Sequence, residues 1–230
     1  MDSWGHHAVA AQRDATLVPM LSYSRSMLDE AGSGVLSAAR DWPGAVGEDV
    51  ADRIALYMRR LLEWNQRVNL TGARNFEDLL GEHLPDSFAV SKLVPLDSSV
   101  VDVGAGGGLP GIPFALLRPD CRVTLLEPRA KRVAFLNTAV RETACKNVSV
   151  VRARLEEVAS LRFDVAVSRA TFSPEEWLEL GPSLLLASGR VVLLTTSAVE
   201  PKAANARLVD SVGYRTSGGS TRWAGCYCFT

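Results

Sequence analysis

Residues 100–111 read Val100-Val101-Asp102-Val103-Gly104-Ala105-Gly106-Gly107-Gly108-Leu109-Pro110-Gly111. The start of this stretch is an apolar run typical of a buried strand, and the glycines that follow are typical of a tight turn. Because glycine has no side chain, it also lets the backbone approach a ligand closely. A strand that runs into a glycine-rich turn and then a helix predicts a nucleotide-binding site.

Strands and helices alternate outward from this turn, from Ser98 to the end of the chain. Further strands are predicted at 122–127, 148–151, 163–168 and 190–195, helices at 130–144 and 174–186, and a closing pair at Tyr214 and 223–229. Such alternation indicates βαβ units, with helices on both faces of a mostly parallel sheet.

The chain before the sheet has a helical pattern. Apolar residues recur every four and three positions from Val50 to Val68, which predicts an amphipathic helix of about five turns. A second helical stretch is predicted at 75–94. We therefore divide the chain into an N-terminal extension without a motif (1–45), a helical part (46–96) and a sheet domain (97–230).

The composition is that of a globular protein with nearly balanced charge. Of 230 residues, 47% are hydrophobic, and 25 Lys plus Arg face 26 Asp plus Glu, for a net charge of −1. This argues against binding nucleic acid by bulk attraction alone. By region, however, residues 1–117 carry 9 basic and 15 acidic side chains, whereas residues 118–169 carry 11 and 6. The basic excess follows the glycine turn, either as solvated helix faces or as a surface that contacts phosphates.

The cysteines and histidines give no sign of a disulfide scaffold or a metal site. Cys226 and Cys228 are separated by one residue, unlike the C-x-x-C of zinc sites, and we interpret them as reduced core thiols on one strand face. The adjacent His6 and His7 are interpreted as solvated, so no metal is expected. Because no secretory signal or membrane span is visible, we expect a cytoplasmic protein.

Three residues around the turn predict the kind of ligand. Glu127, at the end of the second predicted strand, can accept hydrogen bonds from ribose hydroxyls. Leu109 replaces the third glycine of the dinucleotide fingerprint, which counts against NAD, and Asp102 favours a ligand with a cationic group. We favour an S-adenosylmethionine-dependent methyltransferase over another nucleotide-binding protein or a turn without a ligand.

Motifs on both sides of the turn are shared with one known family. They are Trp64-Asn65, Asn69-Leu70-Thr71, His83, Asp86-Ser87, Asp102 to Pro113, Leu125-Leu126-Glu127, Lys131-Arg132, Phe135-Leu136, Arg154-Leu155-Glu156, Phe163-Asp164 and Ser168-Arg169-Ala170. In these motifs the chain resembles the RsmG (GidB) family, bacterial enzymes that use S-adenosylmethionine to methylate guanine N7 in small-subunit ribosomal RNA. The resemblance implies a Rossmann-like class I methyltransferase fold with a seven-stranded, mostly parallel sheet and an N-terminal helical extension.

The resemblance also implies roles for individual residues. Those that would bind the cofactor are Gly104, Ala105, Gly106, Leu109, Glu127, Leu155, Glu156 and Arg169. Those that would position the substrate are Arg169, Asn65, Asn69 and His83, and those of an RNA-facing rim are Lys131, Arg132 and Arg154. Guanine N7 carries a lone pair and no proton, so no catalytic base is expected.

Each role has a structural alternative. Glu127 can be a solvated strand end, and Arg169 can be a surface arginine. Asn69 and Thr71 can be local caps of the preceding helix, and His83 can be a satisfied structural histidine. Trp64 lies on the apolar helix face and is expected in the core.

One departure from the family leaves the substrate open. Thr195-Thr196-Ser197 follows the last parallel strand, where the family usually shows Lys-Gly. We expect a monomeric enzyme that acts on guanine N7 of 16S ribosomal RNA, without metal or membrane. The alternative is a divergent paralogue that binds S-adenosylmethionine and methylates a small molecule or acts as a non-catalytic binder.

Overall fold

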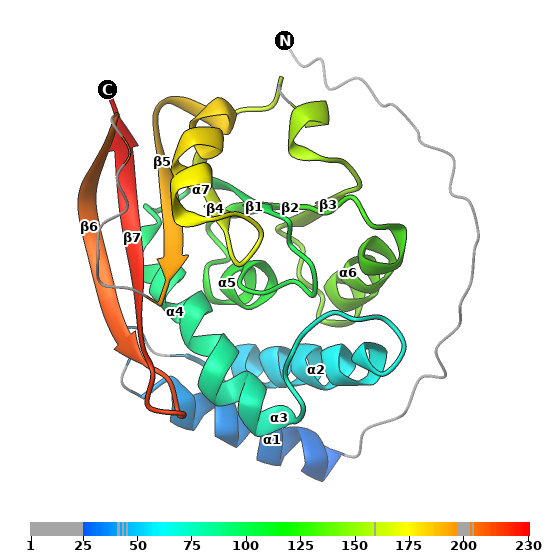
Figure 1. Cartoon of the computed structure of the whole chain (residues 1–230). Coiled ribbons are helices and arrows are strands. Elements are labelled where there is room, and N and C mark those ends of the chain that lie inside the picture. Colours follow the sequence, from blue (N-terminus) through cyan, green and yellow to red (C-terminus); the bar gives the residue numbers. More distant parts are fainter. Residues whose placement is uncertain are drawn as a thin grey trace.

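The sheet predicted around the glycine turn has seven strands in the order β3-β2-β1-β4-β5-β7-β6 (Figure 1). This computed structural model describes residues 25–40, 42, 44, 46–158, 160–196, 203 and 205–230. The strands are β1 (Ser99–Val103), β2 (Arg122–Leu126), β3 (Val148–Val151), β4 (Phe163–Ser168), β5 (Leu185–Thr195), β6 (Ala206–Arg215) and β7 (Thr221–Phe229). β1 to β5 pair in parallel, and β7 pairs antiparallel with β5 and β6. The mostly parallel sheet of the predicted fold is confirmed.

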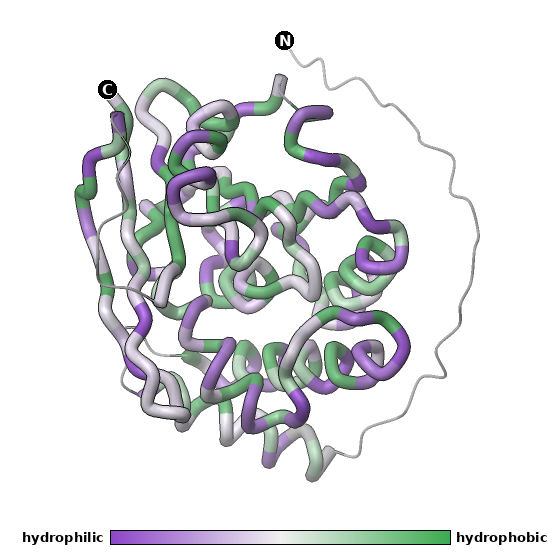
Figure 2. Tube along the Cα trace, in the orientation of Figure 1, coloured by the Kyte–Doolittle hydropathy of each residue, from purple (hydrophilic) through white to green (hydrophobic). Residues whose placement is uncertain are grey.

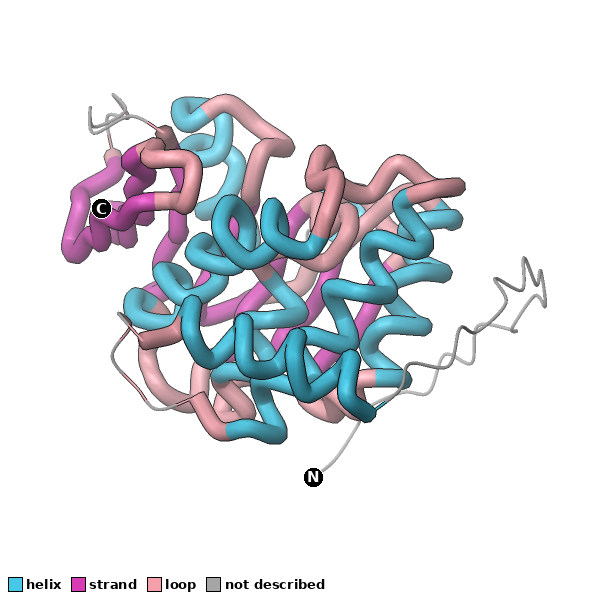
Figure 3. Tube along the Cα trace, turned by 90° about the horizontal axis from the view of Figure 1, so that it is seen from below, coloured by secondary structure: helices cyan, strands magenta, loops and turns pink. Residues whose placement is uncertain are grey.

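Helices cover both faces of this sheet (Figures 1 and 3). They are α1 (Arg25–Ala38), α2 (Glu48–Asn65), α3 (Phe76–Asp78), α4 (Leu84–Leu93), α5 (Gly111–Leu117), α6 (Ala130–Glu142) and α7 (Pro174–Leu180). Side chains alternate between the faces of a strand, so Val100 joins the core beneath α2, α4, α5 and α6, whereas Val101 joins the core beneath α7. Figure 2 shows apolar residues both along β5 and in the helices that pack on the sheet, such as α2.

Helix α1 lies in the extension for which no element was predicted. Its Val35 is fully buried, and the helix packs on α2. Gly32 permits this approach, because a Cβ there would lie 2.1 Å from Asp52 Oδ1. The same glycine weakens the helical pattern of the sequence, which explains why the pattern did not reveal α1. The division into three parts stays a prediction.

The second predicted helix, at 75–94, is interrupted rather than continuous. A π-helical turn, Leu79–His83, separates α3 from α4, and Leu84 donates its N–H to the Leu79 carbonyl. Pro85 explains the interruption, because it has no N–H and its ring would clash with the carbonyl one helical turn earlier. The turn places His83 at the head of α4, beside the sheet.

The predicted helix at 174–186 is too long. Helix α7 ends at Leu180, a 3₁₀ turn spans Gly181–Leu184, and β5 begins at Leu185 rather than at residue 190. Gly181 lies against β5, where a Cβ would come within 2.8 Å of Val191 Cγ2. Close packing of the turn on the strand therefore ends the helix early.

The remaining expectations concern single residues. Cys226 is buried and Cys228 half-buried on β7, and both are free thiols. Trp64 packs against the core, with its ring 5.6 Å from that of Phe135. His6, His7 and Ser197 lie outside the described residues. No helix in the described part of the chain is long and apolar enough to cross a membrane.

Candidate cofactor and substrate site

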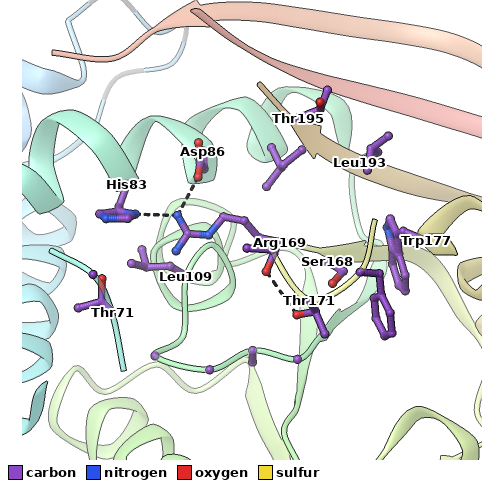
Figure 4. A pocket seen from close by; sticks show the side chains of 18 of the residues that line it. Thr71, His83, Asp86, Leu109, Ser168, Arg169, Thr171, Trp177, Leu193 and Thr195 are labelled. Carbon is purple, nitrogen blue, oxygen red and sulfur yellow. Dashed lines mark hydrogen bonds and ion pairs between the residues drawn. The ribbon is translucent and has the colours of Figure 1, made fainter. Parts of the chain in front are cut away.

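A cavity of about 590 Å³ opens at the carboxyl ends of β1, β4 and β5 (Figure 4). This is where ligands bind in open α/β sheets, beside the point at which the strand order reverses. The segments that line it include Leu70 to Gly72, Gly104 to Gly107, Leu109, Ser168 to Phe172 and Leu193 to Thr196, together with His83, Asp86, Arg132, Trp177, Tyr214 and Arg222.

The glycine turn forms one wall of the cavity. Gly104 and Gly106 have φ values of 73° and 57°, a left-handed conformation that residues with a Cβ rarely adopt. A Cβ on Gly104 would lie 2.3 Å from Thr171 Oγ1, so glycine is also required for the close approach of the loop after β4. The Tyr57 hydroxyl supports the turn from below by donating to the Gly107 carbonyl at 2.7 Å.

Glu127 is buried at the base of this turn, with 2% of its surface exposed. Its Oε2 accepts from the N–H of Gly106 at 3.0 Å, and its Oε1 accepts from the N–H of Arg129 at 2.9 Å. Arg132 Nη1 lies 3.7 Å from Oε2. Glu127 is therefore no solvated strand end. A carboxylate offers about four lone-pair positions, so acceptor capacity remains, although Glu127 lies behind the turn and is not among the residues that line the cavity.

Asp102 lies beneath the turn and is 1% exposed. Its Oδ2 accepts from the N–H of Gly111, the first residue of α5, at 3.0 Å. Its Oδ1 has no partner among the described residues, and burial raises the pKa of the carboxyl group to about 7. Asp102 thus holds the start of α5 and does not itself line the cavity.

A buried carboxylate, Asp86, organises the opposite wall. It accepts hydrogen bonds from Tyr214 Oη at 2.6 Å, Arg169 Nη1 at 2.8 Å and Arg222 Nη1 at 3.2 Å. These donors come from β6, the loop after β4 and β7, so Asp86 ties three elements to α4. The sequence predicts a role for Arg169 but none for Tyr214 or Arg222, because nothing local indicates their approach to Asp86.

The ring of His83 is neutral in this arrangement. Arg169 Nη1 lies 2.8 Å from His83 Nδ1, and a guanidinium can only donate (Figure 4). Nδ1 therefore accepts, which places the ring proton on Nε2. Burial and the positive charge of Arg169 lower the pKa of His83 to about 4, in agreement with this tautomer. Arg169 is accordingly not a free surface arginine.

A second ion pair balances the charge of this wall. Arg222 Nη2 lies 3.1 Å from Glu82 Oε2, and Arg222 also donates to the Glu82 carbonyl oxygen. The Glu82 Oε1 accepts from the N–H of Gly218 in the β6–β7 turn at 2.7 Å. Two carboxylates, Glu82 and Asp86, thus face two guanidinium groups, and the neutral His83 adds no charge. This wall can accept a cationic ligand without net repulsion.

The loop after α2 is shaped by Asn65. Its Oδ1 accepts from the N–H groups of Leu70 and Thr71 at 2.8 and 3.0 Å, and its Nδ2 donates to the Thr71 carbonyl at 2.9 Å. Leu70 and Thr71 line the cavity, whereas Asn69 is exposed and contributes its carbonyl to Arg132 Nη2 at 3.1 Å. Asn65 is therefore the local cap of this helix end.

Other residues with predicted roles lie away from the cavity. Leu155 and Glu156 belong to a 3₁₀ turn, Leu155–Val158, and neither lines the cavity. Lys131 and Arg154 are exposed, whereas Arg132 is half-buried and does line it. The structure brings Arg169 and His83 together with the glycine turn, and the cofactor contacts of Leu155 and Glu156 stay predictions.

Comparison with known proteins places the chain in a family. Residues 51–212 match GidB, described as rRNA small subunit methyltransferase G. The ribosomal RNA small subunit methyltransferase G of Neisseria meningitidis serogroup B is 42% identical over 125 residues, which cover 54% of this chain and 60% of that protein. That of Mesoplasma florum is 30% identical over 167 residues, which cover 71% and 70%. The chain thus spans about 60% of the length of the curated Neisseria relatives.

Solved structures share the fold. A mutant of MtNAS superposes with a TM-score of 0.53 at 14% identity, covering 88% of this chain and 86% of that one. The protein PH0793 of Pyrococcus horikoshii gives 0.50 at 13% identity, covering 62% and 61%. Because the family match extends over most of the sheet and the resemblance in its motifs is confirmed, the chain belongs to the GidB family of rRNA small subunit methyltransferases.

Proposed function

We propose that this protein is an S-adenosylmethionine-dependent methyltransferase that methylates N7 of a guanine in 16S ribosomal RNA. The observation that carries the proposal is the cavity between the glycine turn and the charge-balanced wall of Glu82, Asp86, Arg169 and Arg222. The protein that contains this cavity belongs to the GidB family, whose description names methylation of small-subunit ribosomal RNA.

The residues present fit this cofactor. Gly104 and Gly106 keep one wall free of side chains, and Glu127 retains acceptor capacity suited to ribose hydroxyls. Beneath the turn, the buried Asp102 has an Oδ1 without a partner among the described residues, and an ammonium or sulfonium group in the cavity would favour its ionised form. When bound, S-adenosylmethionine supplies an electrophilic methyl group on its sulfonium.

The chain's own residues need only bind and orient the guanine. Because N7 has a lone pair and no proton, its methylation needs no general base. A neutral His83 agrees with this requirement, since its Nε2–H is a donor rather than a base. The guanidinium of Arg169 adds further donors, and guanine O6, beside N7, is an acceptor. Orientation alone can lower such a barrier by about 7–11 kcal/mol.

Methyl transfer from labelled S-adenosylmethionine tests the proposal. The purified protein is incubated with bare 16S ribosomal RNA, small subunits and assembled ribosomes, with Arg169→Ala as the inactive control. We expect label in a guanine of at least one substrate, and none with Arg169→Ala. If no guanine is labelled in any substrate, the proposal is wrong.

A second candidate function is a divergent paralogue that methylates a small molecule or only binds the cofactor. Thr195 and Thr196 favour it, because they line the cavity where the family usually presents a lysine. Calorimetric binding of S-adenosylmethionine, combined with RNA affinity that does not change with salt, would support this candidate over the first.

A further inference from the structure

An aromatic pair lines the cavity beside Arg169. The Phe172 ring lies 5.5 Å from the Trp177 ring at an interplanar angle of 7°, a parallel stack. Trp177 is 1% exposed, and its indole N–H donates to the Val192 carbonyl at 3.1 Å. Phe172 is half-buried and, like Trp177, lines the cavity. The buried tryptophan therefore fixes the orientation of a phenylalanine ring at the cavity wall.

The loop that carries Phe172 has an unusual backbone conformation. Ala170 has a φ of 56°, which is rare for a residue with a Cβ. It lies between Arg169 and Phe172, and both of these residues line the cavity. The same short loop thus presents a guanidinium anchored by Asp86 and an aromatic ring anchored by Trp177.

The sheet order determines which end of the cavity the pair occupies. The glycine turn follows the central strand β1, and Glu127, the expected ribose ligand, ends the β2 edge of the site. Phe172 follows β4, and Thr195 ends β5, on the other side of β1. A cofactor that extends from β1 toward β2 places its adenosine away from Phe172. The aromatic pair therefore lies on the acceptor side.

From this placement we propose that Phe172 is the surface on which the acceptor nucleobase stacks. The inference rests on the proposed function and adds the residue that holds the base. Bases acted on by such enzymes are unpaired or flipped out, and aromatic rings compensate for the stacking that they lose. A ring already held parallel to Trp177 loses little side-chain freedom when a base stacks on it.

Kinetics of Phe172 variants test this role. Phe172→Leu keeps an apolar side chain but removes the ring, and Phe172→Tyr keeps the ring. The control is Phe229→Leu, which removes a half-buried phenylalanine of the same apolar cluster at the opposite end of β7 from Arg222. Because base stacking on aromatic residues is substantial, we expect Phe172→Leu to lower kcat/KM for RNA about tenfold or more. Phe172→Tyr and Phe229→Leu should keep most of the activity, and S-adenosylmethionine affinity should stay unchanged in all three.

Two results would overturn the proposal: full activity of Phe172→Leu, or loss of cofactor affinity in parallel with activity. A binding measurement distinguishes failure of the stacking role of Phe172 from failure of the proposed function. 7-Methylguanosine monophosphate is titrated into wild-type protein and Phe172→Leu in the presence of S-adenosylhomocysteine. If wild type methylates no RNA but binds this nucleotide better than Phe172→Leu, the proposed function fails and the stacking surface stands. Equal binding by both proteins, or none by wild type, contradicts the stacking role.

Discussion

Arg169 Nη1 lies 2.8 Å from both His83 Nδ1 and Asp86 Oδ2, and this double contact sets the chemistry of the cavity wall. The guanidinium neutralises the buried carboxylate and at the same time forces the histidine into its uncharged form. A single side chain thus provides a neutral donor at His83 and an anchored cation at Arg169. Neither property can be read from the residue types alone.

The protonation of His83 gives a pH-dependent prediction. The pKa of His83 is about 4 in the folded protein, against an ordinary 6.5. Between about pH 4 and pH 6.5, the unfolded chain therefore binds a proton on this ring that the folded protein does not. The contribution of His83 to stability is therefore complete above about pH 6.5 and is lost as pH falls toward about 4. Comparing the urea unfolding of wild type and His83→Gln separates the contribution of His83 from those of the other titrating groups. Wild type should lose more stability on acidification, and equal losses would contradict the neutral ring.

Glu127 provides a prediction about the cofactor. Its buried carboxylate holds the N–H of Gly106 and is expected to hold the ribose. Glu127→Ala should therefore weaken S-adenosylmethionine binding by about 1–3 kcal/mol, the cost of leaving buried partners unpaired. Glu127→Gln keeps one acceptor oxygen and should lose less affinity for S-adenosylmethionine. Calorimetry measures both, with thermal unfolding as a check on folding, and unchanged affinity in Glu127→Ala would refute the role.

The β6–β7 hairpin completes the cavity wall by docking on α4 and the preceding π-helical turn. Tyr214 reaches Asp86 from β6, and Gly218 in the hairpin turn reaches Glu82. Gly81 permits this docking, because a Cβ there would lie 1.9 Å from Ser217 Oγ. The C-terminal hairpin thus contributes Tyr214 and Arg222 to the cavity wall and extends the sheet as well.

Tyr214→Phe tests this docking. It removes one donor from buried Asp86 but keeps the ring, which contacts Trp42 at 5.7 Å between centroids. We expect a loss of about 1–3 kcal/mol in the free energy of unfolding, because a buried acceptor loses its partner. The same substitution in an Asp86→Ala background should have little effect. An equal effect in both backgrounds would show that the Tyr214–Asp86 bond is not the cause.

The elements differ in how far the sequence predicts them. Strands β1 to β4 and helices α2 and α6 follow from local periodicity, because burial on one face imposes a fixed spacing. Helix α1 does not follow from local periodicity, since Gly32 serves its packing on α2 and Gly34 lies against Leu80 of the π-helical turn. The Tyr214–Asp86 bond joins residues 128 positions apart and leaves no local pattern. Glu127 and the glycine turn were predictable because strand, turn and acidic residue follow one another closely.

At the scale of the whole molecule, the net charge of −1 is a cancellation between regions. The basic excess of residues 118–169 includes the exposed Lys131 and Arg154 and the half-buried Arg132, which lines the cavity. Such a distribution favours selective binding of phosphates beside the site over indiscriminate attraction to RNA.

Matched charge reversals test this distribution. Lys131→Glu should lower RNA affinity and reduce its dependence on salt concentration, because each lost phosphate contact removes a counterion-release contribution. Arg207→Glu changes the net charge equally but lies exposed on β6, in the region with balanced charge. Fluorescence anisotropy over a salt series should show a smaller slope for Lys131→Glu alone. Identical slopes for the two variants would contradict a phosphate contact of Lys131.

Identification of the methylated nucleoside tests the proposed methylation of guanine N7 most directly. Small subunits and bare 16S ribosomal RNA are treated with protein and S-adenosylmethionine, digested to nucleosides and analysed by mass spectrometry against authentic standards. We expect 7-methylguanosine that depends on the cofactor and is absent with Arg169→Ala. Methylation at another nucleobase atom, or no methylated nucleoside at all, would contradict it.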